Sequence, residues 1–259
     1  MTEKISWTTF LPTIGLAAAM LTVWQLLIWF GNLPPILLPS PWAVVVAGWD
    51  NRVVLGRGAW VTGAAAVAGF CASLVIGTLT AALMSQSRML RLAMYPYVIL
   101  LQTVPIVAIA PLLVIWSGYE FRTVVLVTLI ISLFPIINNV TEGLIAISSD
   151  RLDLFRLYGA TRMQTLWRLR VPAAISHLML GAKTSSGLAV IGAIVAEFFV
   201  GNGGANYSGL GTLMTGWQSL GRTAPLMAAL CVSTFLGVIM FASVQLVSRT
   251  ILQRWMGND

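Results

Sequence analysis

The sequence predicts an all-α polytopic membrane protein with about six transmembrane helices, and three observations carry that prediction. Of the 259 residues, 58% are hydrophobic and only 9% are charged, whereas a soluble domain carries roughly 25% charged residues. Six segments are long and apolar enough to cross a bilayer. Basic residues also gather on alternate connections between these segments. So little charge cannot cover a soluble surface, which excludes a soluble enzyme, a disordered chain and a disulfide-stapled secreted module.

A helix needs about 20 apolar residues to cross the hydrocarbon core. The predicted spans are residues 10–30, 60–84, 94–117, 122–141, 177–200 and 224–247. The first span follows Lys4 and ends without a small-residue cleavage site, so we interpret it as a retained helix rather than a signal peptide. Together the spans form one transmembrane domain over residues 1–259.

Small residues recur at every fourth position of the second and fifth spans. The rows are Gly69, Ser73, Gly77, Ala81 and Ser85 in one span, and Gly181, Ser185, Ala189, Ala193 and then Glu197 in the other. Small side chains let helix backbones approach closely in lipid, where packing drives helix association. Both rows therefore predict helix–helix contacts rather than a substrate role.

Basic residues predict which ends of the spans face the cytoplasm. With the N-terminus inside, the cytoplasmic segments hold Lys4, Arg88, Arg91, Arg151, Arg156, Arg162, Arg168, Arg170, Arg249 and Arg254, and the opposite side holds Arg52, Arg57, Arg122 and Arg222. Lys183 is left out because it is too near a span. This asymmetry predicts cytoplasmic N- and C-termini. It also explains the net charge of +7 without a nucleic-acid partner.

Two connections are long enough to hold structure of their own. Residues 31–59 are predicted outside, with an interfacial helix that runs through Trp49. Residues 142–176, predicted to be cytoplasmic, form the only sizeable polar segment of the chain. A cytoplasmic partner would therefore contact this second segment, which we call the 142–176 loop.

The 142–176 loop has the pattern of two short helices joined by a turn. Apolar residues alternate with charges at near-helical spacing on both sides of Gly159. Gly159 is predicted at the turn with a positive φ, and Pro172 near the start of the next helix. Taken alone, this pattern also fits an amphipathic hairpin that rests on anionic headgroups through its arginines.

The spacing of the 142–176 loop resembles a known motif. Gly159 is followed thirteen residues later by Pro172, which is similar to the Glu-Ala-Ala-x3-Gly-x9-Ile-x-Leu-Pro motif of bacterial ABC importer permeases. Asp153-Leu154-Phe155 stands where the family has Glu-Ala-Ala. In that family the loop forms a coupling helix that docks on the ATPase. The resemblance thus implies ATPase-coupling roles for Asp153, Leu154, Phe155, Tyr158, Gly159, Ala160 and Pro172.

Other segments resemble the nitrate/sulfonate/taurine branch of these permeases. They include Leu38-Pro39-Ser40-Pro41 and Ala196-Glu197 followed by Gly209-Leu210-Gly211. That branch includes permeases for thiamine pyrimidine precursors and riboflavin. The resemblance implies the permease subunit of an ATP-driven importer for a small polar solute in the bacterial inner membrane. The implied partners are a second permease chain in a homodimer, two ATP-binding cassette ATPase subunits and an extracytoplasmic binding protein.

The sequence offers no catalytic machinery of its own. The string most similar to a phosphate-binding loop, Gly181-Ala182-Lys183-Thr184, lacks the glycine before lysine and lies in an apolar helix. With two cysteines and one histidine, no metal site is predicted, and no cofactor. We therefore predict a non-catalytic subunit. A secondary transporter and a membrane-embedded hydrolase remain the alternatives.

Four polar residues in or near the spans are candidates for the translocation path or its gate. Glu197 is expected either to border the path as a gating group or to reach water at the outer end of its helix. Gln102, followed by Pro105, suggests a broken helix, and Asn138 and Asn139 offer amides to a solute or another helix. Trp116, Tyr119, Tyr207 and Trp217 fit an outer aromatic belt. The Gly201–Gly211 loop is expected to fold back towards the pore mouth.

Overall fold

The computed structural model describes residues 7–201 and 207–256, and within these ranges the regular structure is helical. Lys4, the side chain of Arg254 and the centre of the Gly201–Gly211 loop lie outside the described residues. The helices are α1 (Trp7–Gly31), α2 (Pro41–Asp50), α3 (Arg52–Gln86), α4 (Arg88–Thr103), α5 (Ile106–Ser117), α6 (Phe121–Ile145), α7 (Ser149–Leu157), α8 (Arg162–Thr165), the π-helix η1 (Leu166–Arg170), α9 (Val171–Val200), α10 (Leu210–Ser219) and α11 (Thr223–Met256).

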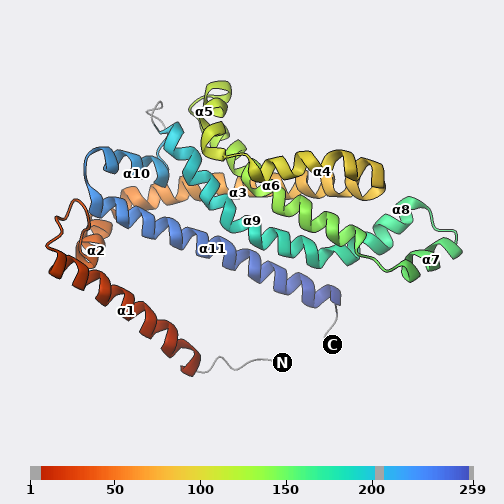
Figure 1. Ribbon diagram of the computed structural model, residues 1–259, viewed down its shortest axis with the longest axis horizontal. Helices are drawn as coiled ribbons and strands as arrows, with labels where there is room; N and C mark the ends of the chain where they lie inside the picture. The colour runs from red at the N-terminus through yellow and green to blue at the C-terminus, as the bar shows by residue number, and fades with distance from the viewer. Residues whose placement is uncertain (1–6, 202–206, 257–259) are drawn as a thin grey trace.

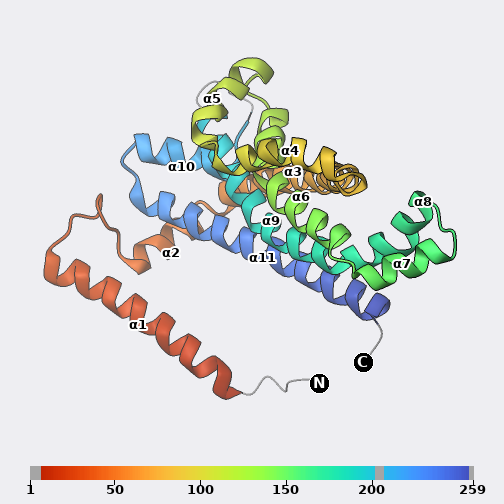
Figure 2. The same cartoon turned by 45° about the vertical axis from the view of Figure 1, so that its right-hand side comes forward.

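The helices form an elongated bundle with distinct ends (Figure 1). The short helices α7 and α8 lie at one end, near the end of α11, whereas α2, α5 and α10 lie towards the other. Helix α1 stands apart from the bundle in both views (Figures 1 and 2), and almost all of its described side chains are exposed. Among the described residues, five helical stretches are long and apolar enough to cross a membrane, and a bent pair makes a sixth if it counts as one span.

Helix α9 is the centre of the bundle, because it packs against α3, α5, α6, α10 and α11. Every member of the two rows of small residues is buried. At Gly181 a Cβ would lie 3.0 Å from the Pro135 carbonyl oxygen of α6. One turn along, the Ser185 hydroxyl donates to the Ser132 carbonyl at 2.7 Å. The prediction that these rows pack helices together is confirmed.

Gly69 gives a direct test of this close packing. A Cβ there would lie 2.5 Å from the Thr128 Cβ and 2.9 Å from the Val125 carbonyl oxygen of α6. Relieving this clash requires a shift of the α6 backbone. We therefore expect Gly69→Ala to destabilise the folded protein by about 1–3 kcal/mol. Gly237→Ala on α11 is the control, because a Cβ there meets nothing within 4 Å. Thermal unfolding of both variants in detergent measures the difference, and equal midpoints would contradict it.

The third predicted span is wrong as a single helix. Residues 94–117 fall on α4 and α5, which bend by 96° at a short break. Val104 is extended (φ −70°, ψ 123°) immediately before Pro105, because the proline ring disfavours the helical conformation in the preceding residue. The break in backbone hydrogen bonding that the proline suggested is therefore present, but it turns the chain sharply instead of kinking a straight span.

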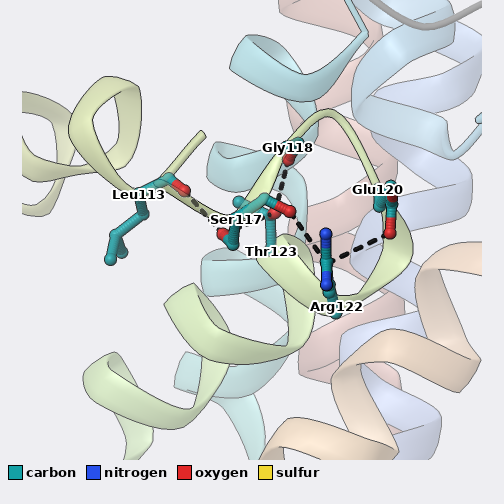
Figure 3. A network of polar contacts seen from close by, with 6 residues as sticks. All are labelled: Leu113, Ser117, Gly118, Glu120, Arg122 and Thr123. Atoms are coloured by element: carbon teal, nitrogen blue, oxygen red, sulfur yellow. Dashed lines mark hydrogen bonds and ion pairs between the residues drawn. The ribbon is translucent and has the colours of Figure 1, made fainter. Parts of the chain in front are cut away.

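A polar turn fixes α5 against α6 (Figure 3). Gly118 ends α5 with φ +86°, a conformation that L side chains rarely adopt. The Thr123 hydroxyl donates to the Gly118 carbonyl and lies 2.8 Å from the Ser117 hydroxyl. The Arg122 Nε donates to the Ser117 carbonyl at 2.8 Å and lies 3.1 Å from Glu120 Oε2. These bonds hold the bent α4–α5 pair at a defined angle to α6.

The segment before α3 contains a helix where an interfacial helix was predicted. Helix α2 begins after Ser40, whose hydroxyl accepts a bond from the Ala43 amide at 3.2 Å, and Pro41 suits the first helical position. Trp42 and Trp49 are 74% and 69% exposed, as expected for interfacial aromatics. Helix α3 begins at Arg52, eight residues earlier than the predicted span.

The predicted aromatic belt is wrong for two of its four residues and stays a prediction for the other two. Trp116 and Tyr119 are exposed, but Tyr207 and Trp217 are buried at 8% and 7% exposure. Both belong to the segment of α10, which packs on α9 and α11 instead of facing the headgroups. An aromatic residue next to a span predicts an interfacial position. The sequence pattern does not indicate that the short segment carrying this residue folds back onto the bundle and buries it.

Candidate coupling loop and intramembrane polar site

The turn of the 142–176 loop has the predicted geometry. Gly159 follows α7 with φ +67°. The Gly159 amide donates to the Arg156 carbonyl at 2.9 Å, and the Ala160 amide donates to the Phe155 carbonyl at 3.0 Å. This pair of bonds is the Schellman arrangement, which closes a helix by placing the residue after it in the left-handed region. The prediction of a positive φ at Gly159 is confirmed.

The next helix starts as sharply as α7 stops. The Thr161 hydroxyl accepts from the Gln164 amide at 3.2 Å, while the Thr161 amide donates to Gln164 Oε1 at 2.8 Å. This reciprocal pair is a capping box, and it satisfies two amides at the start of α8. Two opposed capping motifs therefore enclose the three-residue turn from Gly159 to Thr161.

The second arm of the loop runs directly into the next span. Pro172 lies at the second position of α9, near the start of a helix as predicted. Helices α8, η1 and α9 continue without a gap from Arg162 to Val200. A π-turn at Leu166–Arg170 precedes the proline, and the Val171 amide bonds the Leu166 carbonyl five residues back. Proline removes one hydrogen bond of an α-helix and crowds the turn before it. The wider π-turn accommodates Pro172, so α8, η1 and α9 form one continuous rod.

Three of the predicted coupling residues, Asp153, Leu154 and Phe155, lie on α7. Helix α7 has no buried residue. Leu154 is 51% exposed and Tyr158 is 83% exposed, while Phe155 is partly buried. Asp153 is exposed too, and its carboxylate pairs with Arg156 at 2.9 Å. Tyr158, Gly159 and Ala160 directly follow α7, whereas Pro172 lies on α9, away from this surface. The role of all these residues in coupling stays a prediction.

The base of the loop is tied to the bundle by one long-range bond. Arg170 Nη1 donates to the Ser85 carbonyl at the end of α3, at 2.7 Å. Leu166, one turn earlier, is buried in a cluster that includes Ala81 of α3 and Val140 of α6. The rod from Arg162 to Val200 is therefore anchored where it leaves the bundle.

Glu197 lies fully buried at the other end of this rod. Its Oε1 accepts bonds from the Thr62 hydroxyl of α3 and the Tyr207 hydroxyl, both at 2.9 Å. Its Oε2 accepts the Gly211 amide of α10 at 2.7 Å. The Thr62 hydroxyl in turn accepts the Leu210 amide at 2.8 Å. The side chain is hydrogen-bonded inside the protein, so the interpretation that it reaches water is wrong.

The Glu197 carboxylate serves as the cap of α10. It sits at the N-terminal end of that helix, where unpaired amides and the helix dipole favour a negative group. A Cβ at Gly209 would fall 2.0 Å from Glu197 Oε1, and one at Gly211 would fall 2.6 Å from the Ile194 carbonyl. Burial raises the pKa of the Tyr207 phenol well above its usual range, which keeps its hydroxyl a donor. Glu197 thus joins α9, α3 and α10 at one point.

The amide candidates lie elsewhere and bond within their own helix. Asn139 Nδ2 donates to the Pro135 carbonyl at 2.7 Å, and Asn138 Nδ2 donates to Glu142 Oε1 at 3.0 Å. Gln102 is exposed beside the α4–α5 bend. These contacts match the commoner structural role of such amides in membrane helices. A role in the path stays a prediction for all three.

Sequence reasoning missed one group. Lys183 was set aside as too near a span, but it lies well inside α9 and is partly exposed. The signal that could have found it is the cost of any ionisable side chain within a span. Among the described residues, no three His, Cys, Asp or Glu side chains come together as a possible metal site.

The model of the binding-protein-dependent transport system inner membrane component matches residues 73–253, from within α3 to near the end of α11. The chain belongs to this family. It is therefore a multi-pass transport permease of the ABC type. The matched region contains both the 142–176 loop and Glu197.

Three curated permeases illustrate what this permease is similar to. The formylaminopyrimidine transport permease protein ThiX of Halalkalibacterium halodurans is 32% identical over 84% of this chain and 86% of its own. The riboflavin transport system permease protein RibX of Chloroflexus aurantiacus is 29% identical over 98% and 92%. The putative aliphatic sulfonates transport permease protein SsuC of Escherichia coli is 28% identical over 95% and 90%.

A solved structure has the same fold. A chain of the MetNI methionine ABC transporter superposes with a TM-score of 0.65 and 17% sequence identity, covering 78% of this permease and 98% of that chain. The predicted all-α membrane fold of the type I importer permeases is confirmed.

Proposed function

We propose that this permease is the membrane subunit of an ATP-driven importer in a bacterial inner membrane. Two copies pair as a homodimer, two ATP-binding cassette ATPases dock on the 142–176 loops, and a binding protein outside the membrane delivers a small polar solute. Since the names of the relatives cover pyrimidine, riboflavin and sulfonate transport, the solute class is open at this level. Calorimetry of the binding protein against these compounds would identify it.

One observation carries the proposal: the 142–176 loop presents a rigid, exposed helix at the end of a continuous rod. Leu157 and Tyr158, at the end of α7, are 85% and 83% exposed. Large exposed apolar side chains on a helix with no buried residue support a protein-binding role. The capping motifs around Gly159 fix the direction of α7 relative to α8, as docking into a complementary groove requires.

The rod supplies a mechanical connection between the loop and the opposite side of the bundle. From Arg162 to Val200 it has 39 residues, which is about 60 Å of helix at 1.5 Å per residue. A displacement of α7 and α8 by an ATPase would tilt this rod as a unit. At its far end Glu197 would carry α10 with it through the bonds to Gly211 and Tyr207.

Reconstitution separates this proposal from its alternatives. The permease is purified with its neighbouring ATPase and binding protein and placed in liposomes. We expect solute uptake only when all three are present and ATP is hydrolysed. Uptake by the permease alone under an ion gradient would indicate a secondary transporter, and bond cleavage by the permease alone would indicate a membrane hydrolase.

Cysteine labelling tests the orientation that docking requires. In a cysteine-free background, Ser149→Cys and Gln253→Cys should react with a membrane-impermeant maleimide only from the cytoplasmic side, and Asn51→Cys only from outside. The expectation follows from the basic asymmetry of the connecting segments. Labelling of Ser149→Cys from outside in intact cells would overturn the orientation, and ATPase docking on α7 with it.

A further inference from the structure

One face of α9 stays open although this helix is the centre of the bundle. The residues on this face follow one another at steps of three or four positions: Ala173, Ser176, Leu180, Thr184, Gly187 and Ile191. Leu180 and Ile191 are 55% and 56% exposed. A Cβ on Gly187 would meet nothing within 4 Å. The other faces of α9 are covered by α3, α5, α6, α10 and α11.

Lys183 belongs to this open face. It stands three positions after Leu180 and four before Gly187, so the three side chains are neighbours on the helix surface. Lys183 is partly exposed. Within residues 7–201 and 207–256, the structure gives its ammonium no hydrogen bond and no salt bridge. The open face therefore carries an unpaired positive charge.

The charge lies inside a predicted span. Lys183 is six positions after the first residue of the span 177–200 and seventeen before the last. These separations are about 9 Å and 25 Å along a helix, whereas a lysine stem has only four carbons. Facing lipid, the ammonium would have to stretch most of the way to the nearer headgroups, which costs free energy.

Water or a counter-charge must therefore face Lys183. A dry contact with a second chain would require an acidic partner. Among the described residues, the only acidic one within the predicted spans is Glu197, fourteen positions away and already bonded to Thr62, Tyr207 and Gly211. The polar or small neighbours Ser176, Thr184 and Gly187 suit a hydrated surface.

We propose that the face of α9 around Lys183 lines the translocation path and that Lys183 makes this path selective for anions. The solute then carries an anionic oxygen group that pairs with the ammonium during passage, and a cationic solute is repelled. This inference rests on the proposed function, because a path exists only if the chain forms one with its partners. It goes further by proposing that the solute is an anion and that Lys183 is the residue that recognises it.

Charged thiol reagents test this inference without knowledge of the solute. The reporter is Thr184→Cys in a Cys71→Ser, Cys231→Ser background, in membrane vesicles permeabilised on both sides. The anionic sulfonatoethyl and the cationic trimethylammonioethyl methanethiosulfonates are compared. Val75→Cys on α3, 61% exposed in an apolar groove, is the control for a lipid-facing position. Each reporter is measured with Lys183 present and as Lys183→Gln or Lys183→Arg.

We expect Thr184→Cys to react with both reagents and Val75→Cys with neither. The ratio of anionic to cationic rates at Thr184→Cys should fall about tenfold in Lys183→Gln, as expected for one nearby charge in a hydrated site. Lys183→Arg should keep the ratio. An unreactive Thr184→Cys would show that the face is dry and would overturn the inference. An unchanged ratio would equally overturn the anion selectivity.

Recovery of the ATPase on co-purification, measured on the same variants, distinguishes failure of the path assignment from failure of the proposed importer function. An unreactive Thr184→Cys permease that still recovers the ATPase would reject the path assignment and leave the importer standing. Loss of ATPase recovery from the unmodified permease would instead reject the importer.

Discussion

Gly159→Val should leave the permease correctly inserted and yet unable to hold its ATPase. Gly159 has φ +67° and open space around its Cβ position. The substitution therefore meets no clash with neighbours, and its cost comes from the backbone alone. A left-handed conformation costs L residues roughly 1–2 kcal/mol, and a β-branched residue is a stronger outlier there. The turn relaxes, and the bonds that stop α7 are lost.

The consequence is confined to the loop, because α7 has no buried residue. Leu154, Phe155 and Tyr158 would point in a new direction, while the spans stay folded. We expect normal amounts of permease in the membrane and at least tenfold less ATPase on co-purification. A complex that hydrolyses ATP without uptake is the same defect in a milder form.

A graded series at the same position makes the test specific. Asparagine tolerates the left-handed region, alanine less so and valine least. ATPase recovery should therefore fall in the order Gly159→Asn, Gly159→Ala, Gly159→Val. Wild-type recovery and uptake for Gly159→Val would mean that the 142–176 loop only rests on headgroups, and the importer proposal would lose its main support.

Glu197→Gln should loosen α10 while leaving ATPase binding intact. The carboxylate only accepts hydrogen bonds, and three donors point at it: Thr62, Tyr207 and the Gly211 amide. The glutamine amide replaces one acceptor with a donor. The two hydroxyls can rotate but the Gly211 amide cannot, so one buried bond is lost or misaligned. Such a loss costs about 1–3 kcal/mol.

Hydrogen exchange measures this loosening directly. The amides at the start of α10 should exchange roughly ten- to a hundredfold faster in Glu197→Gln, which corresponds to that cost. Uptake or basal ATP hydrolysis of the assembled transporter should change in parallel. Glu120→Gln is the matched control, because its carboxylate is 61% exposed and pairs only at the surface. Unchanged exchange and uptake in Glu197→Gln would leave Glu197 as a static cap with no part in gating.

The sequence by itself determined the class of protein, the approximate spans and several local conformations. The low fraction of charged residues indicated a membrane protein, and runs of about 20 apolar residues located the spans. The four-residue rows through Gly69 and Gly181 predicted where helices touch, because small residues have one main use in lipid. The positive φ at Gly159 was also predictable, since a glycine between two amphipathic stretches ends a helix in a known way.

Only the tertiary structure decided how remote segments meet. Pro172 was expected near the start of a helix and lies there in α9, but only the structure shows that this helix continues directly from α8 through a π-turn. Glu197 in isolation could reach water or stay buried. Its burial depends on Thr62, more than a hundred positions earlier, and on α10 folding back so that its first amides meet the carboxylate. Lys183 could be assigned to the open face of α9 only because the structure shows that the other faces are covered by neighbouring helices. Local sequence sets conformational preferences within a few residues, whereas the partner of a buried charge is set by which helices pack together.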